Sequence, residues 1–500
     1  MEDGNIKILT LYPSSEETAP IKCSVVPHSL SQSPSYEALS YTWGDPVDIC
    51  SVPIEINGCA KQISTNLEAA LRVLRHGDSP RVLWIDALCI NQEDNSEKSR
   101  QIAKMGSIYA SAVRVLIWLG LGDEESDFAM SIIGRLNSAA DVDNITENGW
   151  NAMENLFSRA WFKRIWVVQE FKRGRSPVFQ CGQKTFSWDT ASDILQKLWT
   201  SEDSVCKKHV KLLGEVGKVV SMAATRADLP LITLIDISHA ACSFVQMLRV
   251  YGGCQATEPR DKIYGLLGLS DAFSFPGGNP PAIDYTKPVN DVYTDWAIFL
   301  IKTQRALDIL YMSPRMQRHS DLPSWVPDWR NAPNDLWLTL DVFKGSFKYD
   351  SPSEIVLDPV PYFNNYGRYL SIHGFVVITI KKDFTFSDPD IKFIASKLDS
   401  RPQVELVNSF LTMGCKLKNA PVEDFAAHGL AECRKEFRYQ GIHCIIPNAT
   451  TDGDVVCVLG NSEIPFVLRP VGDRYELVGD AYVENRSTDF LPKVITFTIQ

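Results

Sequence analysis

Four side chains that could bind or react with a ligand lie at the end of one apolar run of this chain. The run extends from Val82 to Ile90, and the side chains lie within it and just beyond it: Asp86, Cys89, Asn91 and Gln92. A helical pattern and a second apolar run, Val113 to Leu119, come next. Strand, helix and strand in this order predict a parallel sheet, and ligands collect at the carboxyl ends of such strands. The alternative is structural, and this stretch alone favours it: Asp86 and Asn91 cap and turn the chain, and Cys89 is buried.

The helix that would join these two strands is marked at its beginning. Asp94 and Glu97 are spaced as in a capping box, in which each side chain accepts a hydrogen bond from the other residue's backbone amide. One apolar stripe follows at spacings of three and four: Ile102, Met105, Tyr109 and Ala112. The sequence therefore predicts one crossover helix that lays this stripe on the sheet.

A second group of candidates lies in one predicted helix, Arg159 to Arg173. One stripe of this helix is apolar and contains Trp161, Ile165 and Val168. Another stripe combines a carboxylate, an indole and three cations: Arg159, Lys163, Trp166, Glu170 and Arg173. A stripe of this kind is ordinarily a solvated face with salt bridges and a partly buried tryptophan, so the helix alone assigns no function.

Length and composition describe a globular protein of two or three domains. The chain has 500 residues, of which 45% are hydrophobic and 22% charged. Its formal net charge is -11. A nucleic-acid surface needs clustered Lys and Arg, so this charge argues against a nucleic-acid partner.

Targeting and metal-binding patterns are not visible in the sequence. The amino terminus, MEDGNIKILTLYP, carries acid where a secretory signal carries base, and no apolar stretch approaches the length of a membrane span. The 12 cysteines contain no C-x-x-C, and the 8 histidines contain no H-x-x-x-H. We therefore expect a cytoplasmic protein without a membrane partner, a disulfide framework or a metal site.

The predicted architecture is α/β followed by β. Residues 1–190 are expected to form an α/β domain with a parallel sheet, residues 191–345 a helical middle region, and residues 346–500 a β-rich domain interrupted by a helical insertion from Lys392 to Arg438. Short β-branched segments in the last region predict a small barrel or sandwich. Local signals predict two hairpins, one at Asn57-Gly58 and one from Val178 to Trp188, and a second capping box at Thr65 and Glu68.

Three ordered blocks of the chain resemble the fungal heterokaryon-incompatibility (HET) domain family. They are YEALSYTWGDP from Tyr36, the LWIDALCINQED stretch from Leu83, and RAWFKRIWVVQE from Arg159. Later blocks, including ATEPRDKIYGLLGL and LPSWVPDWR, resemble the region that commonly follows this domain in filamentous fungi. The resemblance therefore covers most of the chain.

The resemblance implies a fold distantly similar to that of TIR domains, and a role in incompatibility and cell death. By this resemblance Glu170 takes the place of the glutamate that NAD-cleaving TIR domains use, so it is the first catalytic candidate, with Asp86 and Glu97 after it. Cleavage of the nicotinamide bond passes through an oxocarbenium-like state that a carboxylate stabilises. No cofactor is expected, because NAD would be the substrate. The remaining candidates would bind the ligand: Tyr41, Trp43, Gly44, Cys89, Asn91, Gln92, Arg159, Arg164 and Trp166.

Two other functions fit the same sequence. The cleft could belong to an enzyme of fungal secondary metabolism that acts on a small metabolite by acid-base chemistry, since no receptor-like repeat array is visible in the chain. The chain could also be a non-catalytic interaction module whose β-rich domain binds another protein or a second copy of itself. The first two functions expect a small-molecule ligand, and the third expects Glu170 in a surface salt bridge.

Overall fold

The structure is a computed structural model that covers the chain in separate stretches. It describes residues 5–44, 53–135, 144–189, 191–192, 244–269, 278–304, 307–312, 321–331, 361–364, 367–388, 434–439, 442–460, 462, 464–485 and 494–500. The helices predicted between residues 190 and 241 lie outside the described residues, as does most of the predicted insertion from Lys392 to Arg438.

The chain divides into two compact units. The first contains Met1–Ile232 together with two later segments, Cys254–Asp271 and Ile283–Thr286, and the second contains the remainder. The division into three regions at residues 190 and 345 stays a prediction. No helix in the described parts of either unit is both long and apolar enough to cross a membrane.

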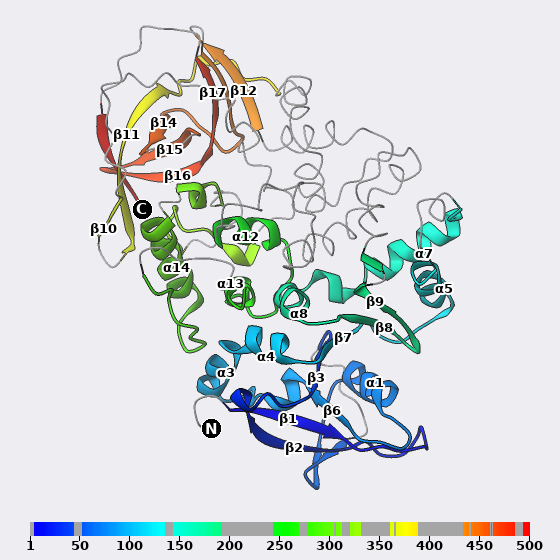
Figure 1. Ribbon diagram of the computed structural model, residues 1–500. Coiled ribbons are helices and arrows are strands. Elements are labelled where there is room, and N and C mark those ends of the chain that lie inside the picture. The colour runs from blue at the N-terminus through cyan, green and yellow to red at the C-terminus, as the bar shows by residue number, and fades with distance from the viewer. Residues whose placement is uncertain are drawn as a thin grey trace. The chain divides into compact units, whose positions relative to one another are not determined.

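The described strands of the first unit form one mixed sheet (Figure 1). Its order is β5-β4-β2-β1-β6-β3-β7-β8-β9. The strands are β1 (Asn5–Leu11), β2 (Lys22–Ser29), β3 (Glu37–Ser40), β4 (Ile54–Ile56), β5 (Cys59–Lys61), β6 (Arg81–Trp84), β7 (Arg114–Trp118), β8 (Val178–Cys181) and β9 (Lys184–Ser187).

The centre of this sheet is parallel, as the sequence predicts. Strand β3 pairs in parallel with β6 on one side and β7 on the other, and β7 pairs in parallel with β8. If these four strands are numbered by their order in the chain, they lie across the sheet in the order 2-1-3-4. The strand order therefore reverses between β3 and β7. The carboxyl ends of β3 and β7 are therefore the place where this kind of sheet binds ligands.

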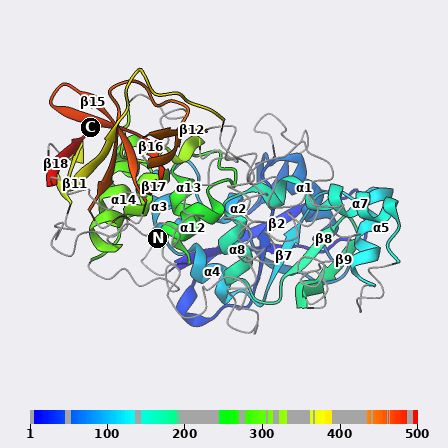
Figure 2. The ribbon, with the colours of Figure 1, turned by 90° about the horizontal axis from the view of Figure 1, so that it is seen from above.

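The described helices of the first unit lie between these strands along the chain, except the last one, which follows β9. Besides the short helix η1 (Leu30–Gln32), they are α1 (Thr65–Leu74), α2 (Asp86–Cys89), α3 (Asn95–Ile102), α4 (Met105–Ser111), α5 (Glu124–Ile133), α7 (Glu147–Phe157), η2 (Ala160–Lys163), α8 (Val167–Arg173) and α13 (Asp261–Leu267). Helices α5 and α7 lie side by side next to the hairpin of β8 and β9 in both views (Figure 1 and Figure 2). This hairpin and the one at Asn57-Gly58 are confirmed.

Three local predictions are wrong in detail. The first apolar run does not stay a strand to Ile90, because β6 ends at Trp84 and Asp86 begins the short helix α2. An apolar run buried on all sides does not distinguish strand from helix. The predicted crossover helix is two helices, α3 and α4, with a break at residues 103–104. Ser64 rather than Thr65 caps α1, since its side chain accepts the hydrogen bond from the amide of Leu67.

The predicted helix from Arg159 to Arg173 is also broken. Helix η2 ends at Lys163 and α8 begins at Val167, and between them the amide of Ile165 donates to the backbone oxygen of Gln255 at 2.9 Å. Helical periodicity does not continue across such a break. The alternative of a solvated stripe does not hold for Trp166 and Glu170, which are buried, although Lys163 is exposed.

The second unit combines a few helices with mostly antiparallel sheets. Its helices are α12 (Phe244–Tyr251), α14 (Val289–Gln304), η4 (Leu307–Met312) and η6 (Trp329–Asn331). Its strands are β10 (Tyr362–Asn364), β11 (Tyr369–Thr379), β12 (Arg434–Tyr439), β13 (Ile442–Pro447), β14 (Val455–Leu459), β15 (Phe466–Val471), β16 (Arg474–Asp480), β17 (Tyr482–Asn485) and β18 (Val494–Ile499). One sheet has the order β10-β11-β14-β15-β16-β18 with β18 also paired to β11, and a smaller sheet joins β12, β13 and β17. The β-rich end of the chain is confirmed.

Gly106 tests how closely α4 packs on the later part of the first unit. A Cβ atom at Gly106 would lie 2.6 Å from the carbonyl oxygen of Gly268, so Gly106→Ala must push two backbones apart. We expect it to lower the free energy of unfolding by about 1–3 kcal/mol in urea titrations. Gly77→Ala is the control, because its Cβ would meet only the Cα of Ser15 at 3.9 Å. Equal stability of the two variants would contradict this packing.

Candidate functional site

Glu170 lies inside the first unit and not on its surface. Its side chain is 2% exposed, and its carboxylate accepts a hydrogen bond from the hydroxyl of Ser40, the last residue of β3. The Ser40 oxygen in turn accepts a hydrogen bond from Trp161 Nε1 at 2.7 Å. These three side chains join helix α8, the carboxyl end of β3 and helix η2. No salt bridge to Glu170 is found in the described parts of the chain.

The environment of Glu170 keeps its carboxyl group protonated at unusually high pH. Burial raises the pKa of Glu170 to about 7, and the nearby carboxylate of Asp86 also raises it. The guanidinium of Arg164 and the hydroxyl groups of Ser40 and Tyr109 act in the opposite direction but are outweighed. A buried carboxyl that titrates near neutrality can exchange a proton under physiological conditions.

Asp86 provides a second carboxylate beside the first. It is the first residue of α2, directly beyond β6, and it is only partly buried. Its carboxylate accepts hydrogen bonds from Trp43 Nε1 at 2.8 Å and from the amide of Ala87 at 2.7 Å, and its backbone oxygen accepts one from Gln92 Nε2 at 3.2 Å. Burial raises the pKa of Asp86, and the Arg164 guanidinium lowers it.

Trp43 is the exposed part of this group. It follows β3 and precedes Gly44, whose φ of +85° is a conformation that favours glycine. The side chain of Trp43 is 40% exposed although its N–H is bonded to Asp86. The polar edge of the indole is thus engaged, which leaves ring surface available for stacking.

Arg164 places a cation near both carboxyl groups. It lies in the break between η2 and α8, and its guanidinium donates a hydrogen bond to the backbone oxygen of Tyr41. It lowers the pKa of both Glu170 and Asp86. Tyr41 is buried, and its hydroxyl pKa is raised by burial and then by the charge of Asp86. Four chain segments therefore converge at the carboxyl end of β3.

The two carboxyl groups differ in their environments. Glu170 is buried and neutral up to about pH 7, while Asp86 is partly exposed and bonded to two donors. Paired carboxyl groups in different environments are suited to acid-base chemistry and to stabilising a cationic intermediate. Nowhere in the described ranges do three His, Cys, Asp or Glu side chains gather in a way that could hold a metal ion.

The third catalytic candidate, Glu97, has a different set of contacts. Its carboxylate accepts hydrogen bonds from Lys7 Nζ at 2.7 Å and from the amide of Asn91 at 3.1 Å. Asp94 caps α3 as predicted, but Glu97 does not complete the capping box, because it turns to Lys7 and Asn91 instead. Asn91 is exposed and its side chain accepts from the amide of Glu93.

The other predicted binding residues are also engaged in contacts within the chain. Cys89 is buried, and burial raises the pKa of its thiol to about 12, so it is unsuited to be a nucleophile. Arg159 donates to the backbone oxygens of Leu119 and Leu121 and thereby holds the loop after β7. Trp166 donates to Asp261 at 2.9 Å. Their roles in ligand binding stay predictions.

Sequence reasoning missed two residues that organise this region. The hydroxyl of Ser40 donates a hydrogen bond to Glu170. Asn66 in α1 connects the ends of β3 and β7, since it donates to the backbone oxygen of Thr42 at 2.7 Å and accepts from Trp118 Nε1 at 2.9 Å. Ser40 ends a short strand and Asn66 sits in the first turn of a helix, where both residue types are common without a functional reason. Only the contacts across the sheet reveal them.

Comparison with known proteins identifies the domain that carries this site. Residues 36–170 match the family model described as "Heterokaryon incompatibility protein (HET)". The chain is 28% identical over 397 residues to "Heterokaryon incompatibility protein 6, OR allele" of Neurospora crassa. That alignment covers 65% of this chain and 58% of the relative, so the chain spans little more than half of the relative's length. No solved structure matches the chain. The chain therefore carries a HET domain and is a distant homologue of that protein.

Glu170→Gln tests the buried carboxyl without any assay of function. Between pH 4.5 and about 7 the glutamate ionises in the unfolded chain but stays protonated in the folded one, so the wild type loses stability as pH rises. Glutamine cannot ionise, and its carbonyl can still accept from Ser40. We therefore expect the free energy of unfolding of the variant to rise relative to wild type by about 1.4 kcal/mol per pH unit, to a total on the order of 3 kcal/mol near neutrality.

Glu97→Gln is the matched control for this measurement. The pKa of Glu97 lies below its ordinary value, because its hydrogen bonds to Lys7 and Asn91 outweigh the effect of burial. Its ionisation is therefore complete before most of this pH range, and the stability difference from wild type should be flat there. Urea unfolding of the three proteins at a series of pH values makes the comparison. A flat difference for Glu170→Gln would mean that this carboxyl is hydrated and ordinary.

Proposed function

We propose that this HET-domain chain acts in heterokaryon incompatibility by cleaving the N-glycosidic bond of NAD, and that it does so in the cytoplasm. The observation that carries the proposal is the pair of carboxyl groups, Glu170 and Asp86, with Arg164 beside them at the carboxyl end of β3. The distant homology to an incompatibility protein of Neurospora crassa supports the biological role.

The fold proposed for this activity is TIR-like. Four parallel strands in the order 2-1-3-4 are the central part of a doubly wound sheet, in which ligands bind where the strand order reverses. Ser40 ends β3 at this position, and its partner Glu170 lies on the helix that precedes β8. This placement supports the assignment of Glu170 as the glutamate of an NAD-cleaving site.

In the proposed reaction the bond between C1′ of the ribose and the nicotinamide nitrogen breaks, and its electron pair leaves with nicotinamide. Water adds to C1′ and releases a proton, so that the products are ADP-ribose, nicotinamide and one proton. The ribose carries positive charge in between, which a carboxylate stabilises. Asp86 is the more exposed carboxylate and contacts the ribose. Ionised Glu170 adds negative charge from its buried position.

Two further side chains fit the rest of the substrate. The exposed indole of Trp43 stacks on the nicotinamide or adenine ring, and Arg164 provides positive charge for the diphosphate. NAD is a substrate in this proposal, and no additional cofactor is needed. Because Glu170 must be ionised, the rate rises with pH through the pKa of about 7.

Incubation of the purified full-length chain with NAD, followed by mass spectrometry, tests the proposal. We expect the wild type to release nicotinamide, with a rate that increases from pH 6 to pH 8. Glu170→Gln and Asp86→Asn should each lower kcat by about 100-fold, in the range found when a charge-stabilising group is removed. Glu97→Gln is the control and should retain activity, since Glu97 bonds to Lys7 and Asn91.

A parallel incubation with pooled host metabolites separates the alternatives. If NAD stays intact while the wild type, but not Glu170→Gln, converts a metabolite, that result would assign biosynthetic chemistry to this site in place of NAD cleavage. No conversion of NAD or of any metabolite would contradict an enzymatic role and favour an interaction module.

A further inference from the structure

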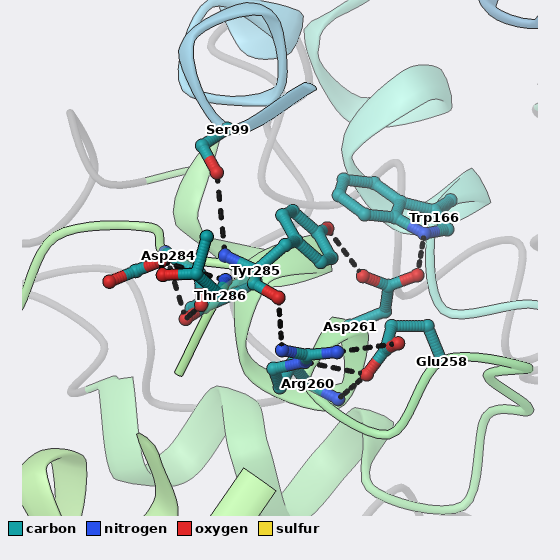
Figure 3. A network of polar contacts seen from close by, with 9 residues as sticks. Ser99, Trp166, Glu258, Arg260, Asp261, Asp284, Tyr285 and Thr286 are labelled. Atoms are coloured by element: carbon teal, nitrogen blue, oxygen red, sulfur yellow. Dashed lines mark hydrogen bonds and ion pairs between the residues drawn. The ribbon is translucent and has the colours of Figure 1, made fainter. Parts of the chain in front are cut away.

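The residues that cover the start of α8 come from far along the chain. Asp261, the first residue of α13, is 9% exposed and uses both carboxylate oxygens (Figure 3). Oδ2 accepts a hydrogen bond from Trp166 Nε1 at 2.9 Å, and Oδ1 accepts one from the hydroxyl of Tyr285 at 2.6 Å. Asp261 thus links two residues that are more than a hundred positions apart.

A second contact holds the chain just before α8. The amide of Gln255 donates to the backbone oxygen of Lys163 at 2.5 Å, and its own oxygen accepts from the amide of Ile165 at 2.9 Å. These two hydrogen bonds involve the residues directly before and after Arg164, whose guanidinium donates to the backbone oxygen of Tyr41 in the candidate site. The break between η2 and α8 is therefore held at Lys163 and Ile165 by Gln255, and at Trp166 by Asp261.

The late segments that supply these contacts are themselves anchored on the HET domain. The amide of Tyr285 donates to Ser99 Oγ at 3.4 Å, and Lys98 Nζ lies 4.5 Å from the centre of the Tyr285 ring. Arg260 donates to the backbone oxygen of Tyr285 at 2.6 Å and pairs with Glu258 at 2.7 and 2.9 Å (Figure 3). Helices α3 and α8 are thereby tied to the same two segments.

We propose that Asp261 is a positioning residue for Glu170, and that the functional unit of this HET domain includes the segments Cys254–Asp271 and Ile283–Thr286, which lie beyond the family match at residues 36–170. Trp166 precedes α8 directly, and its backbone oxygen accepts the hydrogen bond from the amide of Glu170 at 3.2 Å. Because no continuous helix joins α8 to η2, the anchor on Trp166 fixes where the Glu170 carboxyl points. The positioning of Glu170 by Asp261 does not depend on NAD cleavage. Only the expected effect of Asp261 on the rate of NAD cleavage rests on the proposed function.

The titration of Glu170 reports its position without any substrate. Infrared spectra of the full-length chain, recorded over a pH series, contain the C=O band of the protonated carboxyl, which Glu170→Gln identifies by its loss. In the wild type we expect this band to disappear with a midpoint near pH 7. Loosening of α8 admits water to the carboxyl, so the midpoint moves toward the ordinary value of 4.5.

Matched variants of the Asp261 contacts distinguish positioning from general loosening. Asp261→Ala and Trp166→Phe both cut the link to α8 and should lower the midpoint by about one pH unit or more. Tyr285→Phe removes the other donor but keeps the bond between Asp261 and Trp166, so its midpoint should stay near 7. Asp261→Asn retains an acceptor for Trp166 and should also resemble the wild type.

This experiment can either support or overturn the proposal that Asp261 positions Glu170. An unchanged midpoint in both Asp261→Ala and Trp166→Phe would overturn it, and so would an equal shift in Tyr285→Phe. If Asp261→Ala does not fold, the comparison of Trp166→Phe with Tyr285→Phe still gives the answer.

Kinetics with NAD separate this inference from the proposed function. If the wild type cleaves NAD, Asp261→Ala should lower kcat by about 10- to 100-fold with little change in KM, and Asp261→Asn should restore the rate. If the wild type does not cleave NAD, the proposed function fails, and the infrared midpoints alone decide whether Asp261 positions Glu170.

Discussion

The buried carboxyl of Glu170 constrains the rest of the HET domain. A carboxyl group removed from water must be neutral or well bonded, and here it accepts from Ser40, which is in turn bonded by Trp161. Trp161 is itself fixed by edge contacts with the rings of Phe162, Phe171 and Phe179. A polar chain of three residues therefore runs through the aromatic core and connects the end of β3 with α8 and η2.

The same constraint gives the candidate site its chemical asymmetry. Two carboxyl groups lie in one charge cluster, but one is inside the domain and the other is at its edge with an exposed tryptophan. Arg164 favours the charged form of both, and burial favours the neutral form of Glu170 more strongly. The balance leaves Glu170 near its titration point at neutral pH, where a small change in hydration or charge alters its protonation.

The boundaries of the domain depend on structure more than on sequence similarity. The family match covers residues 36–170, yet β1 and β2 extend the sheet before it and β8 and β9 extend it afterwards. The segments around Asp261 and Tyr285 then contact the start of α8 and α3 from 95 and 186 residues later in the chain, respectively. A fragment limited to the matched residues would expose Trp166 and lose the contacts that hold the break before α8.

The sequence by itself determined the elements whose signals are local. The Asn57-Gly58 turn, the Asp94 cap, the parallel strands around Leu83 and Leu116, and the HET blocks all follow from short-range patterns, because backbone preferences and strand burial act over a few residues. It also selected Glu170, Asp86, Trp43 and Arg164 as candidates. Only the tertiary structure decided that Glu170 is buried, that Ser40 is its partner and that Asp261 holds Trp166. Those outcomes depend on a helix break that pairs with Gln255 and on contacts between residues about 90 to 130 positions apart, which no local pattern encodes.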